Sequence, residues 1–162
     1  AAVHNQGSMP GMNMLVDIGN GTMSILEIHD GRPMENSIST EVFGVHQCME
    51  KIQKEVSKHS GVDVPEMLIE PLLRNGIGDR TDAVDLTTKR IAENYTAEIM
   101  KKLIAHGYRE ELVHLYIIDG GGCLLQNFSD LTAKPEVTVI TDICANAKGY
   151  EALAMMKQRM RG

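Results

Sequence analysis

Hydrophobic and polar residues alternate along the first part of the chain, as expected for short strands of a sheet. Two runs of this kind, Met12–Ile18 and Met23–His29, predict a pair of neighbouring strands. Asp30 and Gly31 follow as a dipeptide that favours a tight turn, so a third strand is expected at Met34–Phe43. We expect the three strands to form an antiparallel meander.

The pattern then takes a helical period. Apolar residues recur at i, i+3, i+4, i+7 and i+11 on one predicted face: Val45, Cys48, Met49, Ile52 and Val56. Gly61 is expected to end this helix as its C′ residue. A shorter helix should follow with Pro65 near its first turn, and Pro71 should kink or split it. Thr81–Ala105 is predicted to be the longest helix.

A nearly continuous apolar run, Leu112–Ile118, predicts a central strand covered on both faces. A short helix is then indicated by the apolar residues Leu124, Leu125 and Phe128. Glu136–Ile143 is expected to be the last strand and Ala145–Arg161 a closing helix. The predicted order is β-β-β-α-α-α-β-α-β-α, which places the chain in the α/β class.

Composition narrows the class of protein. With 162 residues, of which 43% are apolar and 23% charged, one globular domain is the default. The net charge of −6 argues against direct nucleic-acid binding, and no apolar run is long enough to span a membrane. The three cysteines are scattered and the six histidines lack ligand spacing, so we expect a reduced, cytoplasmic protein without a metal held by protein ligands alone.

The chain begins Ala-Ala-Val, and we expect it to be a fragment of a longer protein. Residues 1–11 are small and polar, which is typical of a leader or hinge segment, and residues 12–162 should form the domain.

One candidate site lies at Leu15–Ser24, where an apolar run ends in Asp17 and is followed by Gly19 and Gly21. Glycine permits positive φ and lets backbone N–H groups approach a ligand, and successive N–H groups in such a turn suit phosphate oxygens. A carboxylate beside phosphate would act through a hydrated divalent cation or an attacking water. The alternative is a β-hairpin whose glycines serve only the turn.

A second glycine site follows the predicted central strand as Asp119, Gly120, Gly121 and Gly122. One interpretation is a surface on which a flat ring or a ribose lies directly against backbone. The other is a tight strand-to-helix turn in which glycine permits close packing. The residues leave both open.

These motifs and the element order resemble one half of the actin, sugar-kinase and heat-shock-chaperone ATPases. Val16–Thr22 is similar to the second phosphate loop of that superfamily, and Ile118–Gly122 is similar to its adenosine loop. The combination most resembles the ParM/StbA group of bacterial actin-like plasmid-segregation proteins, in their second, carboxyl-terminal domain. The resemblance implies a ribonuclease-H-like fold with a five-stranded mixed sheet flanked by helices.

The resemblance also implies a site for ATP or ADP with Mg²⁺, shared with a first domain that supplies the other phosphate loop. Asp17 would be the catalytic carboxylate and would hold the metal through water. The nucleotide would be bound by two groups of residues: Gly19, Asn20, Gly21 and Thr22 at the phosphates, and Gly120, Gly121, Gly122, Cys123 and Leu124 at the adenosine. Both groups must then open onto the same side of one sheet. A half-site of this kind should bind weakly and hydrolyse hardly at all.

Three functions are compatible with these residues. The first is the nucleotide-binding half of a filament-forming segregation ATPase, with the missing first domain, self-association and a DNA-binding adaptor as partners. The second is half of a sugar or carboxylate kinase that uses the same two loops. The third is a non-catalytic interaction module that has kept the fold.

Overall fold

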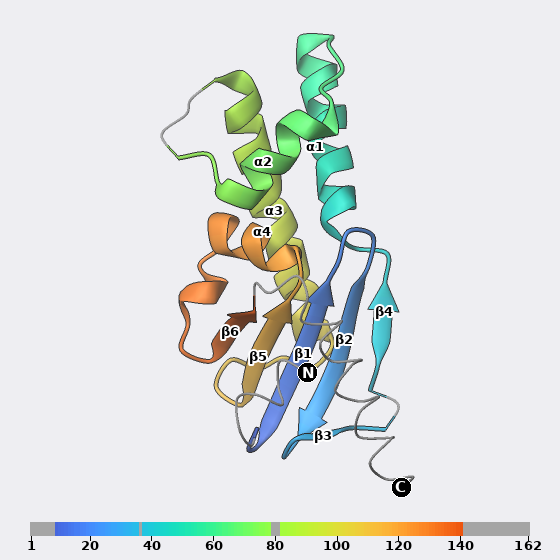
Figure 1. Ribbon diagram of the computed structural model, residues 1–162, viewed down its shortest axis with the longest axis vertical. Helices are drawn as coiled ribbons and strands as arrows, with labels where there is room; N and C mark the ends of the chain where they lie inside the picture. Colours follow the sequence, from blue (N-terminus) through green and yellow to red (C-terminus); the bar gives the residue numbers. More distant parts are fainter. Residues whose placement is uncertain (1–8, 36, 79–81, 141–162) are drawn as a thin grey trace, which may run out of the picture.

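The computed structural model of the protein describes residues 9–35, 37–78 and 82–140 (Figure 1). The strands are β1 (Met12–Ile18), β2 (Met23–His29), β3 (Arg32–Pro33), β4 (Ser39–Glu41), β5 (Val113–Ile118) and β6 (Val137–Ile140). The helices are α1 (Val45–Ser60), α2 (Glu66–Asn75), α3 (Ala83–Ala105), α4 (Gly121–Phe128) and the short 3₁₀ helix η2 (Leu131–Ala133).

The sheet has the mixed topology expected from the sequence. Its strand order is β3-β2-β1-β5-β6, with β4 also paired to β2. β1 is antiparallel to β2 and parallel to β5, and β6 is parallel to β5. The carboxyl ends of β1, β5 and β6 therefore meet at one edge of the sheet. In Figure 1, α1 and α2 stand beyond this edge, and α3 runs behind the sheet.

The third predicted strand, Met34–Phe43, is wrong as a single element. Two short strands, β3 and β4, pair with β2 in its place. Between them, the hydroxyl oxygen of Ser37 lies 3.3 Å from both the backbone N and the backbone O of Glu27. The Ser37 side chain thus takes the place of a backbone hydrogen-bond partner for Glu27. Serine side chains can compete with backbone groups for hydrogen bonds in this way and so interrupt a strand.

α1 follows its predicted period, with Cys48, Met49, Ile52 and Val56 buried. α1 ends at Gly61, whose φ of 68° is left-handed. α3 begins at Ala83, two residues later than predicted, because the side chain of Asp82 caps it by accepting the N–H of Asp85. The predicted split of α2 at Pro71 is wrong, since the helix is continuous through it. Pro71 is exposed, so water can reach the carbonyl that its ring leaves without a donor.

The core lies between one face of the sheet and the inner sides of α1, α3 and α4. Its fully buried side chains include Val16, Ile18, Ile52, Tyr95, Leu103, Leu115, Ile117 and Leu125. Within the described ranges, no helix is long and apolar enough to cross a membrane. The end of the last predicted strand, Cys144 and the predicted closing helix Ala145–Arg161 lie outside the described residues.

Candidate functional site

The turn between β1 and β2 lies at the carboxyl edge of the sheet. It is closed by a hydrogen bond of 2.9 Å from the N–H of Gly19 to the carbonyl of Thr22. The half-buried Asp17 precedes the turn and is paired across the sheet with Ile118 of β5. Neither Gly19 nor Gly21 uses a positive φ, contrary to one expectation from the sequence. A Cβ on Gly21 would meet no atom within 4 Å, so the turn faces open space there.

The first amides of α1 hold this turn from one side. Val45 N–H donates to the carbonyl of Gly19 at 3.0 Å, and His46 N–H donates to the carbonyl of Asn20 at 2.8 Å. In a planar trans peptide the C=O and the following N–H point in opposite directions. The two bonds therefore turn the N–H groups of Asn20 and Gly21 away from α1. Neither N–H donates a hydrogen bond to the described part of the chain.

Gly44 is a site residue that the sequence analysis did not single out. A Cβ at this position would lie 2.4 Å from the carbonyl oxygen of Asn20 and 2.6 Å from that of Gly19. No real Cβ contact is that short, so only glycine lets α1 begin against the turn. A glycine directly before an amphipathic helix was the available signal, since glycine is accepted at helix N-caps.

The β5–α4 junction begins with Asp119, whose φ of 70° is left-handed and whose Oδ1 accepts the N–H of Gly120 at 2.8 Å. Aspartate is among the few residues that tolerate this backbone conformation. Gly121 and Gly122 are buried in the first turn of α4. A Cβ on Gly121 would lie 2.3 Å from Ile18, and one on Gly122 would lie 2.7 Å from Val139. These two glycines serve close helix–sheet packing, as the second interpretation of this motif expected.

The structure brings the two glycine sites together at one edge of the sheet. A Cβ on Gly19 would lie 3.5 Å from Asp119 Oδ2, and one on Gly120 would lie 3.9 Å from Val45 Cγ2. Among the nominated residues, those that are exposed or half-buried here are Asp17, Gly19, Asn20, Gly21, Thr22, Gly120 and Cys123. Leu124 is only 1% exposed and lies behind them in the core, so it could reach a ligand only through its backbone.

The edge combines N–H donors with carboxylates, and this decides what it can bind. The N–H groups suit anionic oxygens, whereas Asp17 and Asp119 would repel them unless a cation lies between. Carboxylates with water and phosphate oxygens form the ligand set that Mg²⁺ prefers, so these residues fit that ion. Among the described residues no group of three His, Cys, Asp or Glu side chains can hold a metal alone. The cation would therefore enter with its anion.

A separate hollow lies away from this edge. It has a volume of about 390 Å³ and is formed by the second half of α3, the end of α4 and η2, with apolar contributions from Ala97, Met100, Phe128 and Leu131. The edge itself is an open surface of one domain rather than an enclosed pocket.

Residues 15–129 match the family described as "Archaeal actin homologue MreB-like, C-terminal". A comparison with functionally curated proteins found no match. The fold is similar to that of Ta0583, an archaeal actin homologue, with a TM-score of 0.73 at 20% identity over 95% of this chain and 52% of Ta0583. The complex of Ta0583 with ADP gives a TM-score of 0.71 at 21% identity, over 95% and 53% of the two chains.

Two ParM structures are also similar. The ParM filament from Clostridium botulinum has a TM-score of 0.73 at 18% identity, over 96% of this chain and 50% of ParM. ParM from Bacillus thuringiensis with ATP has a TM-score of 0.63 at 16% identity, over 85% and 43%. The chain thus spans about half the length of these proteins. The match over residues 15–129, together with the sheet topology, shows that the chain belongs to the MreB-like family of archaeal actin homologues, as a carboxyl-terminal domain.

Proposed function

We propose that this chain is the nucleotide-binding half of a two-domain, filament-forming actin-like ATPase and that its carboxyl sheet edge binds ATP or ADP with Mg²⁺. The observation that carries the proposal is the pair of N–H groups, on Asn20 and Gly21, held away from α1 beside the β5–α4 junction. The ADP complex of Ta0583 and the ATP complex of a ParM support this choice of ligand.

Each residue of the edge has a role in this proposal. The N–H groups of Asn20 and Gly21 and the hydroxyl of Thr22 bind the β- and γ-phosphates, and Gly19 keeps the approach clear. Gly120 and Cys123 lie on the adenosine side, with Gly121, Gly122 and Leu124 supporting them from the core. Asp17 orders water on Mg²⁺ or the attacking water. When bound, Mg²⁺ supplies charge neutralisation for the phosphates.

A single half of the site should bind nucleotide weakly and turn it over hardly at all, because phosphoryl transfer depends on positioning from both sides. Calorimetry with Mg-ATP tests this on two proteins, the present chain and the protein that carries it together with a first domain. Binding that strengthens when the first domain is present supports the proposal. No heat at millimolar nucleotide with either protein would falsify it and favour an interaction module without a ligand.

Filament formation is supported by two apolar surfaces on different parts of the chain. Val62, Met67 and Leu68 are 60–73% exposed around the α1–α2 connection, beyond the carboxyl edge of the sheet. The 390 Å³ hollow lies beside η2, which contacts β6. An apolar projection on one copy that fills a hollow elsewhere on the next copy makes a head-to-tail contact, and such contacts generate filaments when they do not close into a ring.

Light scattering of the two-domain protein with ATP tests assembly. We expect polymer at tens of micromolar protein, and we expect Met67→Glu to abolish it while leaving ATP affinity unchanged. If ATP turnover instead rises with a small hydroxylated substrate and no polymer forms, the kinase alternative replaces the filament.

A role in plasmid segregation is the finer part of the proposal and is motivated by the similarity to ParM. The net charge of −6 makes direct DNA binding unfavourable, so a separate DNA-binding adaptor should link the filament to its cargo. Co-sedimentation of DNA with ATP-assembled filaments tests this. DNA should sediment only when an adaptor is added, and sedimentation without one would contradict the adaptor model.

A further inference from the structure

Tyr95 is a fully buried residue of α3 that reaches the start of α1. Its hydroxyl donates to the carbonyl of Gly44 at 2.8 Å. Its ring stacks on that of Phe43, with centroids 4.3 Å apart and an angle of 3° between the ring planes. Burial raises the pKa of the Tyr95 phenol well above its usual range, so the hydroxyl keeps its proton and remains a donor.

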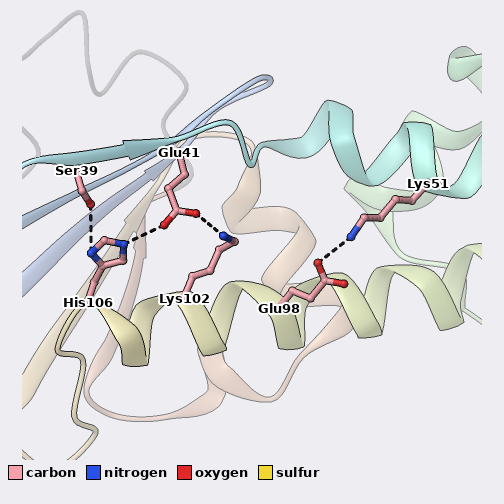
Figure 2. Close-up of polar contacts among 6 residues, drawn as sticks. All are labelled: Ser39, Glu41, Lys51, Glu98, Lys102 and His106. Atoms are coloured by element: carbon pink, nitrogen blue, oxygen red, sulfur yellow. Dashed lines mark hydrogen bonds and ion pairs between the residues drawn. The ribbon is translucent and has the colours of Figure 1, made fainter.

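Two lysines, each in an ion pair, also lie against this pair of rings. Lys51 Nζ lies 4.9 Å from the Tyr95 ring centroid and pairs with Glu98 of α3 at 2.8 Å. Lys102 Nζ lies 4.7 Å from the Phe43 ring centroid and pairs with Glu41 of β4. Figure 2 shows both ion pairs between α3 and the β4–α1 segment.

His106 extends this set of contacts at the end of α3. Its Nε2 lies 2.9 Å from Glu41, and its Nδ1 lies 3.4 Å from the hydroxyl oxygen of Ser39 (Figure 2). The β4–α1 segment is thus tied to α3 at several points. Among these contacts from α3, the Tyr95 hydroxyl is the group that bonds to the carbonyl of Gly44.

Gly44 links these contacts to the turn between β1 and β2, because the start of α1 packs directly against that turn. A Cβ at Gly44 would overlap the carbonyl oxygens of Gly19 and Asn20, and the next two residues donate their N–H groups to those same carbonyls. A shift of Gly44 must therefore either move the turn or break these two hydrogen bonds. The direction of the Asn20 and Gly21 N–H groups depends on them through peptide planarity.

We propose that Tyr95 is a positioning residue for the phosphate-binding turn, acting through Gly44 and the first two amides of α1. The inference rests on the proposed function in one respect, that the turn is the part that binds phosphate. Packing alone does not require the hydroxyl, because phenylalanine would keep the ring stack on Phe43. What the hydroxyl adds is a fixed place for the Gly44 carbonyl, and hence a fixed orientation of the two N–H donors.

The test compares Tyr95→Phe with a matched control, Tyr108→Phe. Tyr108 is also buried, but its hydroxyl has no hydrogen-bond partner in the described part of the chain. Hydrogen exchange is measured at the amides of Val45 and His46, which hold the turn. Loss of one buried hydrogen bond should accelerate their exchange by roughly two- to tenfold in Tyr95→Phe, with no change in Tyr108→Phe.

The second readout is Mg-ATP affinity of the two-domain protein, which we expect to fall by a similar factor in Tyr95→Phe and not in Tyr108→Phe. Unchanged exchange at Val45 and His46 would overturn the inference, and so would equal acceleration at all core amides, because that pattern reports only lost stability. Normal ATP affinity in Tyr95→Phe would overturn it while leaving the proposed function intact. If the unmodified protein binds no ATP, the proposed function fails, and the exchange data still decide whether Tyr95 holds the turn.

Discussion

At the β1–β2 turn Gly21 borders open space, whereas at the β5–α4 junction two of three glycines are pressed against side chains of the sheet. A Cβ on Gly21 would touch nothing, but one on Gly121 would overlap Ile18. The two strand ends look alike in the sequence because glycine serves both purposes. The difference teaches that a glycine motif indicates close approach without saying whether a ligand or the protein itself approaches.

The largest expected contrast concerns the two described cysteines, one near each region. Cys48 of α1 is fully buried, and burial raises the pKa of its thiol to about 12, whereas Cys123 of α4 is half-buried beside the junction. Alkylation of Cys48 near pH 8 should therefore be roughly a thousandfold slower than that of an ordinary thiol. Mass spectrometry of a Cys144→Ser variant measures both rates.

The same alkylation experiment in the presence of nucleotide tests whether Cys123 lies at the adenosine. If adenosine lies against the junction, Mg-ATP should protect Cys123 in the two-domain protein. Modification of Cys48 before Cys123 would contradict the burial of Cys48. Equal rates of Cys123 modification with and without bound ATP would show that Cys123 does not lie on the adenosine side of the site.

The packing role of the junction predicts that Gly121→Ala lowers the free energy of unfolding by about 2–3 kcal/mol, because the added methyl group overlaps Ile18 in the core. Urea denaturation measures the loss. Gly120→Ala is the matched control, since its Cβ would meet only Val45 Cγ2 at an ordinary 3.9 Å. Equal stability of the two variants would show that Gly121 is no more tightly packed than Gly120.

The open turn predicts the opposite behaviour for Gly21→Ala. Its stability should change by less than about 0.5 kcal/mol, as expected for a surface position, because the methyl group meets no protein atom. Mg-ATP affinity of the two-domain protein should nevertheless fall roughly tenfold, or about 1.4 kcal/mol, since the methyl group would lie in the proposed path of the phosphate. Calorimetry gives the affinity, and a large loss of stability without an affinity change would reverse the interpretation.

The smallest predicted effect concerns Glu41 of β4, which pairs with Lys102 and His106. Two hydrogen bonds hold the pKa of this carboxyl below its usual range, the larger effect coming from Lys102 and the smaller from His106. A lowered folded-state pKa means that the stabilisation is present above the unfolded value of about 4.3 and is lost as pH falls through the folded value. The groups are each about a third exposed, so we expect only about 0.5 kcal/mol.

Urea titrations of Glu41→Gln and the unmodified chain measure this effect. The unmodified chain should be more stable at pH 6, and the two should converge by pH 3. A gap that widens in acid would show that the ion pairs do not stabilise the folded state.

Much of the fold followed from local pattern. The bounds of β1 and β2, the end of α1 at Gly61 and the class of the sheet could be predicted because alternation, helical period and turn glycines act over a few residues. The division of the third strand could not, since it depends on where the Ser37 hydroxyl meets Glu27 across the sheet. Contacts between residues that are distant in the chain produce no periodic pattern in the sequence, so they could not be predicted from it.

The candidate site, like the fold, could be predicted only in part. The sequence placed the glycines and Asp17, and parallel pairing of β1 with β5 brought them to one edge. It did not separate Gly120 from Gly121 and Gly122, because the side chains that fill the space above them, Ile18 and Val139, come from other strands. Nor did it point to Gly44 or Tyr95, whose importance arises from contacts made after folding.

The seating of α1 on the turn also has a mechanical meaning. A helix of sixteen residues is about 24 Å long, so a tilt of about 5° at its base moves its far end by about 2 Å. That end leads into Val62 and the exposed apolar residues at the start of α2. The displacement from a small tilt of α1 about Gly44 would therefore be largest at the exposed apolar residues that we propose as a contact between copies of the protein.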